Sequence, residues 1–159
     1  MMIPPAMRRD RANDGVPRSA LRSMVRTLAT RQHGVVARRQ LLELGMSARE
    51  ITGGIERDML RAVHRGVYAL GHDDLPFVGR CAAAVLAVGD GAYITGHAAA
   101  FLRGATKRDP RSIDVTTTRR TKCRVLGVRL QFTRLLPPDE RMFLDRVPAT
   151  SVSRMLVDM

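Results

Sequence analysis

The stretch SAREITGGIERDMLRAVHRGVYAL, residues 47–70, decides the fold of the first part of the chain. It opens on Ser47, and Glu50 follows three residues later, which is the capping-box pattern at a helix start. In this pattern the serine hydroxyl accepts from the backbone amide of the glutamate, and the glutamate reaches back to the serine. The pattern predicts a helix that ends near Arg57. Two isoleucines are expected to turn inward, Ile51 and Ile55.

The second half of the same stretch predicts a basic β-hairpin. Apolar residues recur on either side of His64-Arg65-Gly66, where a glycine can take the backbone conformation that a tight turn needs. Leu60 and Val63 are expected to face Val67 and Leu70 across this turn. A basic hairpin directly after a helix is typical of the wing of a winged helix-turn-helix.

Two further helices are expected before Ser47. Apolar residues recur at helical spacing from Ser19 until His33-Gly34 ends the run, and Ala37 to Leu44 predicts a second helix with Gly45 as its stop. Val35-Val36 between them fits either a short strand or a turn. A very short turn then joins the second helix to the helix at Ser47, so residues 19–72 are predicted to form a winged helix-turn-helix.

The charge balance favours a polyanionic partner. The chain has 27 Lys and Arg against 15 Asp and Glu, a formal charge of +12, and up to His72 it carries 13 basic and 6 acidic residues. When Lys and Arg side chains neutralise the phosphates of a nucleic acid, bound counterions are released, which favours association. Double-stranded DNA is therefore the expected partner. The alternative is that the arginine excess reflects genomic composition. Only 4% of residues are aromatic, which argues against single-strand or RNA platforms and against a membrane-surface helix.

A helix about 10 to 12 Å across fits the major groove with its N-terminal residues at base edges, while the wing lies on the phosphate backbone or minor groove. On the third helix, Arg49, Thr52, Gly53 and Glu56 are expected to face outward. Other basic residues surround that helix and are predicted phosphate contacts: Arg38, Arg39, Arg57, Arg61 and Arg65. His64 is either a donor to phosphate or an ordinary turn residue.

Residues 73–159 predict a small α/β domain with a mostly antiparallel sheet, which makes the whole chain α+β. The expected helices run from about Phe77 to Val88, with Asp74 as N-cap, and from Gly96 to Arg103. Strands are expected at 113–117, 128–132 and 141–147, with the basic loop 119–124 between the first two. A last helix begins near Thr150 or Ser151 and places Val152, Met155, Leu156 and Met159 on one face. This helix reaches Met159 without a cap, so the domain is expected to be truncated there.

At the other end of the chain, residues 1–17 are expected to be a disordered tail.

No enzyme is indicated. The sequence has no GxSxG, no P-loop and no nuclease pattern around Asp114, so catalytic residues, a metal site and cofactors are not expected. Cys81 and Cys123 lie far apart, which suggests two reduced thiols rather than a disulfide or zinc site. No apolar run approaches the roughly 20 residues that span a bilayer, and the start lacks a signal peptide, so a cytoplasmic protein without membrane contact is expected.

Residues 19–72, above all VHRGVYALGH at 63–72, resemble the winged-helix domain of the AbiEi family of antitoxins. AYITGHAAA at 92–100 and VPATS at 147–151 resemble the middle region of actinobacterial members. The resemblance implies a type IV toxin-antitoxin component. Its winged helix would bind inverted repeats in its own promoter and repress it, and its C-terminal part would antagonise a nucleotidyltransferase toxin.

Two alternatives remain open at this point. Relatives of the same kind continue into a Vsr-like endonuclease domain, so this chain could be the DNA-targeting part of a truncated nuclease-family protein. It could also be a protein-interaction module whose basic surface faces an acidic toxin, in which case DNA binding would be absent.

Overall fold

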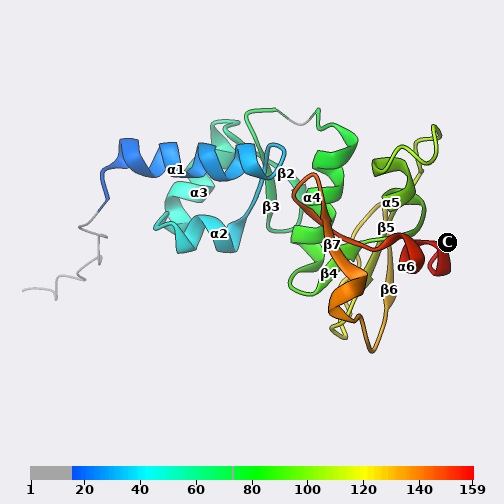
Figure 1. Cartoon of the computed structure of the whole chain (residues 1–159). Coiled ribbons are helices and arrows are strands. Elements are labelled where there is room, and N and C mark those ends of the chain that lie inside the picture. The colour runs from blue at the N-terminus through cyan, green and yellow to red at the C-terminus, as the bar shows by residue number, and fades with distance from the viewer. Residues whose placement is uncertain (1–15, 73) are drawn as a thin grey trace, which may run out of the picture.

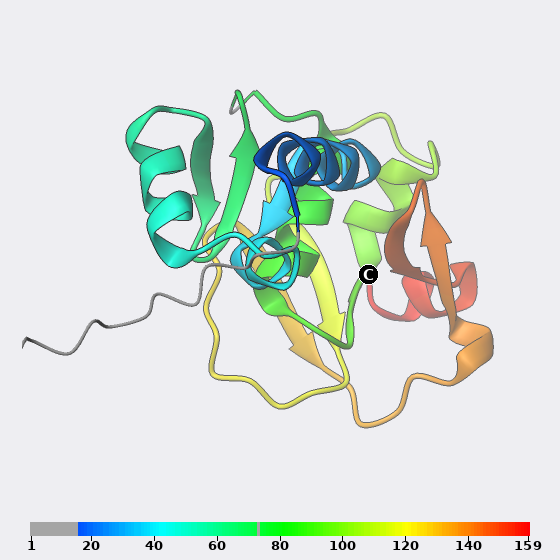
Figure 2. The same cartoon turned by 90° about the vertical axis from the view of Figure 1, so that its left-hand side faces the viewer.

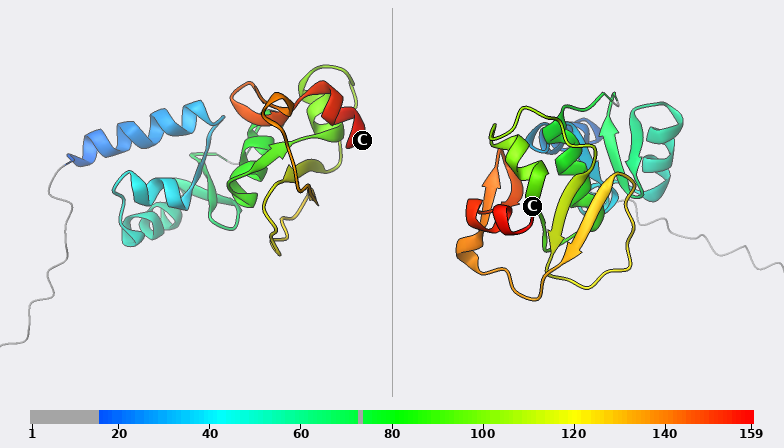
Figure 3. Two further views of the ribbon diagram at one scale, coloured as in Figure 1. Left: turned by 60° about the horizontal axis from the view of Figure 1, so that its bottom comes forward. Right: turned by 90° about the vertical axis from the view of Figure 1, so that its right-hand side faces the viewer.

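The computed structural model describes residues 16–72 and 74–159, so residues 1–15 of the predicted tail lie outside the described residues. The described chain is a mixed α and β structure with six α-helices and two sheets. One end holds the first three helices, the other end holds the second sheet, and the hairpin and α4 lie between them (Figures 1 and 3). The elements follow in the order α1 (Arg18–Arg31), β1 (Val35–Ala37), α2 (Arg38–Glu43), α3 (Ala48–Glu56), β2 (Leu60–His64), β3 (Val67–Leu70), α4 (Phe77–Val88), β4 (Ala92–Ile94), α5 (Gly96–Leu102), β5 (Ile113–Thr117), β6 (Val128–Phe132), a 3-10 turn η1 (Pro138–Glu140), β7 (Arg141–Leu144), β8 (Val147–Thr150) and α6 (Val152–Val157).

The first sheet is antiparallel throughout, with the order β1-β3-β2. Val35-Val36 is therefore a strand rather than a turn. Since side chains alternate across a strand, Val36 and Tyr68 face α1, α2 and α3, where they join a core that includes Leu41 and Ile51. Val35 and its partner on β3 face the opposite side. Both faces of β1 are covered, and all three of its residues are buried.

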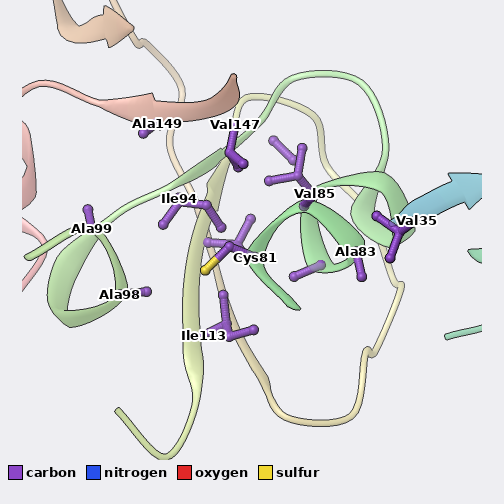
Figure 4. Close-up of a cluster of buried hydrophobic side chains, with 14 of the residues drawn as sticks. Val35, Cys81, Ala83, Val85, Ile94, Ala98, Ala99, Ile113, Val147 and Ala149 are labelled. Atoms are coloured by element: carbon purple, nitrogen blue, oxygen red, sulfur yellow. The ribbon is translucent and has the colours of Figure 1, made fainter. Parts of the chain in front are cut away.

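Helix α4 covers that opposite side. Its residues from Cys81 to Val85 are all buried, and four of these five positions hold cysteine or alanine, whose short side chains let a helix lie close to its neighbours. One core cluster joins Val35 of the first sheet, α4 and the second sheet. Figure 4 shows Ala83 on the side of α4 near Val35, and Cys81 near Ile113. The first three helices and the second sheet are thus connected through α4.

The second sheet has the order β6-β5-β4-β8-β7 and is mixed, so the prediction of a mostly antiparallel sheet is wrong. The pairs β4–β5 and β7–β8 are antiparallel, while β4–β8 and β5–β6 are parallel. The predicted strands at 113–117 and 128–132 are confirmed. Because β6 runs parallel to β5, the basic loop between them has to cross from one end of the pair to the other (Figure 3).

Three local predictions in the second half need correction. The single strand expected at 141–147 is the hairpin β7–β8, which turns at Asp145-Arg146 with positive φ values of 46° and 67°. The N-cap of α4 is Pro76 rather than Asp74. Helix α6 starts after Ser151 as expected, but of its four predicted apolar positions only Met155 is buried.

Among the described residues, no helix is both long enough and apolar enough to cross a membrane.

Candidate nucleic-acid interface

The start of α3 has the predicted capping box. The Glu50 amide donates to Ser47 Oγ at 3.2 Å, and Glu50 Oε2 accepts from the Ser47 amide at 2.8 Å and from its hydroxyl at 2.9 Å. These hydrogen bonds hold the pKa of Glu50 below its ordinary value, and the one from the Ser47 backbone amide has a larger effect than the one from the Ser47 hydroxyl. The nearby positive charge of Arg18 also lowers this pKa. The box fixes the point at which α3 begins, and thereby which residues stand in its first turn.

Helix α3 buries one narrow stripe and exposes the rest. Ile51 is fully buried and Gly54 is buried three residues later, while Arg49 and Thr52 are exposed as predicted. Ile55 was expected inward but is 39% exposed, because the stripe passes through Gly54 instead. Figure 2 shows α3 beside the hairpin, and Figure 1 shows α3 at the end of the molecule away from the second sheet. The exposed face of α3 is therefore not covered by the second half of the described chain.

The two glycines of α3 have different surroundings. A Cβ on Gly54 would lie 3.0 Å from Cδ1 of the buried Leu60 on β2, so the missing side chain lets helix and strand approach closely. A Cβ on Gly53 would lie 3.3 Å from the guanidinium of Arg57, which extends over this position. Gly53, expected to face outward, is therefore only half-exposed.

The hairpin has a two-residue turn, Arg65-Gly66, in which Gly66 takes φ +72° and Arg65 is exposed. His64 does not lie in the turn. It ends β2 after a bulge and is half-buried, and this burial lowers the pKa of its imidazole. His64 is therefore mainly neutral at pH 7, which weakens it as a donor of charge-assisted hydrogen bonds to phosphate.

Helix α2 begins against the hairpin turn. The backbone amide of Arg38 donates to the Gly66 carbonyl at 2.8 Å, which places the first residue of α2 next to the hairpin turn. The guanidinium of Arg39 instead reaches toward Asp90, in the turn between α4 and β4, with 3.8 Å between Nη2 and Oδ1. The Arg39 side chain is about half-exposed and that of Asp90 is mostly exposed, so the pair contributes little stability. Arg61 is half-buried on β2, opposite Ala69.

The structure adds basic residues that the sequence reading did not single out. Arg18, Arg22 and Arg26 of α1 are exposed and line a groove of about 480 Å³ between α1 and α3, together with Arg57. Their spacing of four residues puts them on one face of a helix, which is the signal that could have identified them. Of the eight predicted contact residues, the structure thus places Arg49 and Thr52 on α3, Arg57 at its end, and Arg38 beside the hairpin turn of Arg65.

The two cysteines lie in different surroundings, one buried and one exposed. Burial raises the pKa of the Cys81 thiol to about 12, so it stays protonated and is a poor nucleophile at neutral pH. Cys123 is a free exposed thiol. Within residues 16–72 and 74–159, no group of three or more His, Cys, Asp or Glu side chains is arranged to hold a metal ion.

Comparison with protein-family models and with curated proteins found no match for this chain.

Proposed function

We propose that residues 19–72 are a winged helix-turn-helix that binds double-stranded DNA, and that the protein is a transcriptional regulator of the AbiEi antitoxin type. The single observation that carries the DNA-binding proposal is the capped, outward-facing start of α3, with Arg49 and Thr52 exposed beside a basic hairpin.

The order of elements supports this proposal. Helix, strand, two helices and a two-stranded hairpin follow one another along the chain. β1 pairs with β3, so β1 and β2 form the two edges of the first sheet. This is the arrangement by which winged helices present a recognition helix to the major groove. The turn between α2 and α3 is only four residues long, from 44 to 47, so the two helices are held close together.

Each predicted contact residue has a role in the proposal. Arg49 and Thr52 read base edges in the major groove, where arginine pairs with guanine through two hydrogen bonds. Phosphate contacts come from the basic residues around the helix and fix its register without reading sequence. These are Arg38, Arg39, Arg57, Arg61 and Arg65, with the neutral His64 as a weaker contact.

The antitoxin assignment rests on the resemblance of residues 63–72, 92–100 and 147–151 to AbiEi proteins. Under this assignment the protein binds inverted repeats in its own promoter and represses transcription. Residues 73–159 then belong to the part that antagonises a nucleotidyltransferase toxin.

The test is a titration of the protein against DNA from upstream of its own gene and against a scrambled duplex of equal length. We expect Arg49→Ala to reduce the preference for the upstream DNA by on the order of ten- to a hundredfold. Arg65→Ala should weaken binding to both duplexes alike, because a phosphate contact carries no sequence information. Arg108→Ala, an exposed residue far from α3 in the sequence, is the control.

Two results would overturn the proposal. One is a wild-type protein that binds neither duplex. The other is an Arg49→Ala protein that keeps the same preference as the Arg108→Ala control.

A further inference from the structure

The charged side chains in the connection between β5 and β6 are all positive. From Val115 to Pro138 the sequence has six Lys and Arg residues and no Asp or Glu. All six are exposed, and four of them lie in the loop 119–124, here called the basic loop: Arg119, Arg120, Lys122 and Arg124. Nothing in the proposed roles of α3 and the hairpin uses this loop.

The basic loop begins beside the first half of the molecule. Asp90, in the turn after α4, lies 3.8 Å from the guanidinium of Arg39 and 3.9 Å from that of Arg119. The amide of Thr118 donates to the Gly91 carbonyl at 3.1 Å, which fastens the loop to the same turn. Arg39 belongs to the first turn of α2, so the side chains at the start of α2 and at the start of the basic loop both reach Asp90 in the turn after α4 (the loop is yellow in Figure 2).

Several contacts hold the loop in place. The Arg119 amide donates to Thr117 Oγ1 at 3.2 Å, and the guanidinium of Arg120 stacks 5.1 Å from the centroid of the Phe132 ring. Cys123 Sγ lies 4.0 Å from the carbonyl oxygen of Ala87 on α4. A loop held at both ends and its middle loses less conformational freedom when its side chains bind a partner.

The charge of the loop is largely uncompensated. Asp90 is shared between two arginines and its side chain is 72% exposed, so neither ion pair fixes a guanidinium strongly. Phosphate oxygens accept two parallel hydrogen bonds from a guanidinium, which makes a phosphate backbone a better partner for these arginines than a single shared carboxylate.

We propose that the basic loop binds phosphates of the same duplex that α3 and the hairpin engage, so that the DNA-binding surface continues from the first half onto the second. The inference rests on the proposed function. Its physical basis is the position of Arg119 next to Arg39 and the absence of acidic residues from 115 to 138. The loop adds affinity and length to the footprint without reading sequence.

The experiment compares two triple variants of the full chain with equal change in charge. One is Arg120→Ala/Lys122→Ala/Arg124→Ala in the loop, and the matched control is Lys107→Ala/Arg108→Ala/Arg111→Ala before β5, where the side chains are also exposed. Binding to a fluorescein-labelled duplex of about 30 base pairs is followed by anisotropy between about 50 and 200 mM NaCl. Circular dichroism melting confirms that both variants are folded.

We expect the slope of log K against log salt to be less negative by about 2 to 3 in the loop variant, since each phosphate contact contributes about −0.9. The control variant should keep the wild-type slope to within about 1. Equal slopes for the two variants, with the wild-type protein binding normally, overturn this inference and leave the proposed function standing. A wild-type protein that shows no salt-dependent binding overturns both.

Discussion

Ser47 is the residue on which the start of α3 depends. Its hydroxyl accepts from the Glu50 amide, and its own amide and hydroxyl donate to the Glu50 carboxylate. We expect Ser47→Ala to lower the free energy of unfolding by about 1 kcal/mol, the usual loss for a serine cap. Urea unfolding measures the change, and Ser23→Ala on the exposed side of α1 is the control. Equal midpoints for the two variants would contradict the role of the cap.

The same residue predicts a pH dependence. Glu50 has a pKa below its ordinary value of 4.5 in the folded protein, so its hydrogen bonds stabilise the fold above about pH 4.5 and are lost as pH falls through the lowered pKa. Ser47→Ala removes the side-chain part of this effect. The stability difference between wild type and variant should therefore be largest above pH 4.5 and should narrow in more acidic solution. A stability difference between wild type and Ser47→Ala that grows as the pH falls would contradict this role of the Glu50 carboxylate.

Residue identities predicted the cap and the turn but not the orientation of every side chain. The Ser47–Glu50 spacing was sufficient because capping is local in sequence. Ile55 was placed inward by helical periodicity, and its exposure follows from Leu60 packing over Gly54, a contact between two elements. His64 was placed in the turn because the bulge that shifts the register of β2 has no signature in the sequence.

At the scale of elements, the packing of α3 against β2 depends on Gly54. We expect Gly54→Ala to be less stable than Gly53→Ala by on the order of 1 to 2 kcal/mol, although alanine favours a helix equally at both positions. The added methyl group meets the buried Leu60 in the first case and the movable guanidinium of Arg57 in the second. Thermal unfolding of the two variants makes the comparison, with each serving as control for the other. A Gly54→Ala protein as stable as Gly53→Ala would show that this close approach is unimportant.

The strands were harder to predict than the helices. β4 is three residues long, too short for alternation to be recognised, and it is absent from the strands predicted from the sequence. The hairpin β7–β8 turns at Asp145-Arg146, where both residues have positive φ without a glycine. The parallel pairing of β5 and β6 depends on the path of the loop between them, which no local pattern specifies.

At the scale of the whole molecule, one core cluster includes Val35 of the first sheet, α4 and the second sheet. We therefore expect the two halves to unfold in one transition. Tyr68 on β3 and Tyr93 on β4 give one tyrosine probe for each sheet, and the chain has no tryptophan and no other tyrosine. Tyr93→Phe leaves Tyr68 as the fluorescent probe of the first sheet, and Tyr68→Phe leaves Tyr93 as the probe of the second. In each variant, the unfolding midpoint from tyrosine fluorescence should equal the midpoint from circular dichroism. Two separate midpoints within one variant would mean that the halves unfold independently.

The central claim is that the exposed face of α3 and the hairpin turn together contact a DNA duplex. The most direct test is the change in backbone amide chemical shifts when an isotopically labelled protein is titrated with its own upstream DNA. The account predicts that the largest shifts cluster in the first turns of α3, around Arg49 and Thr52, and at Arg65-Gly66. Shifts confined to residues outside α2, α3 and the hairpin, or no shifts at all, would contradict it.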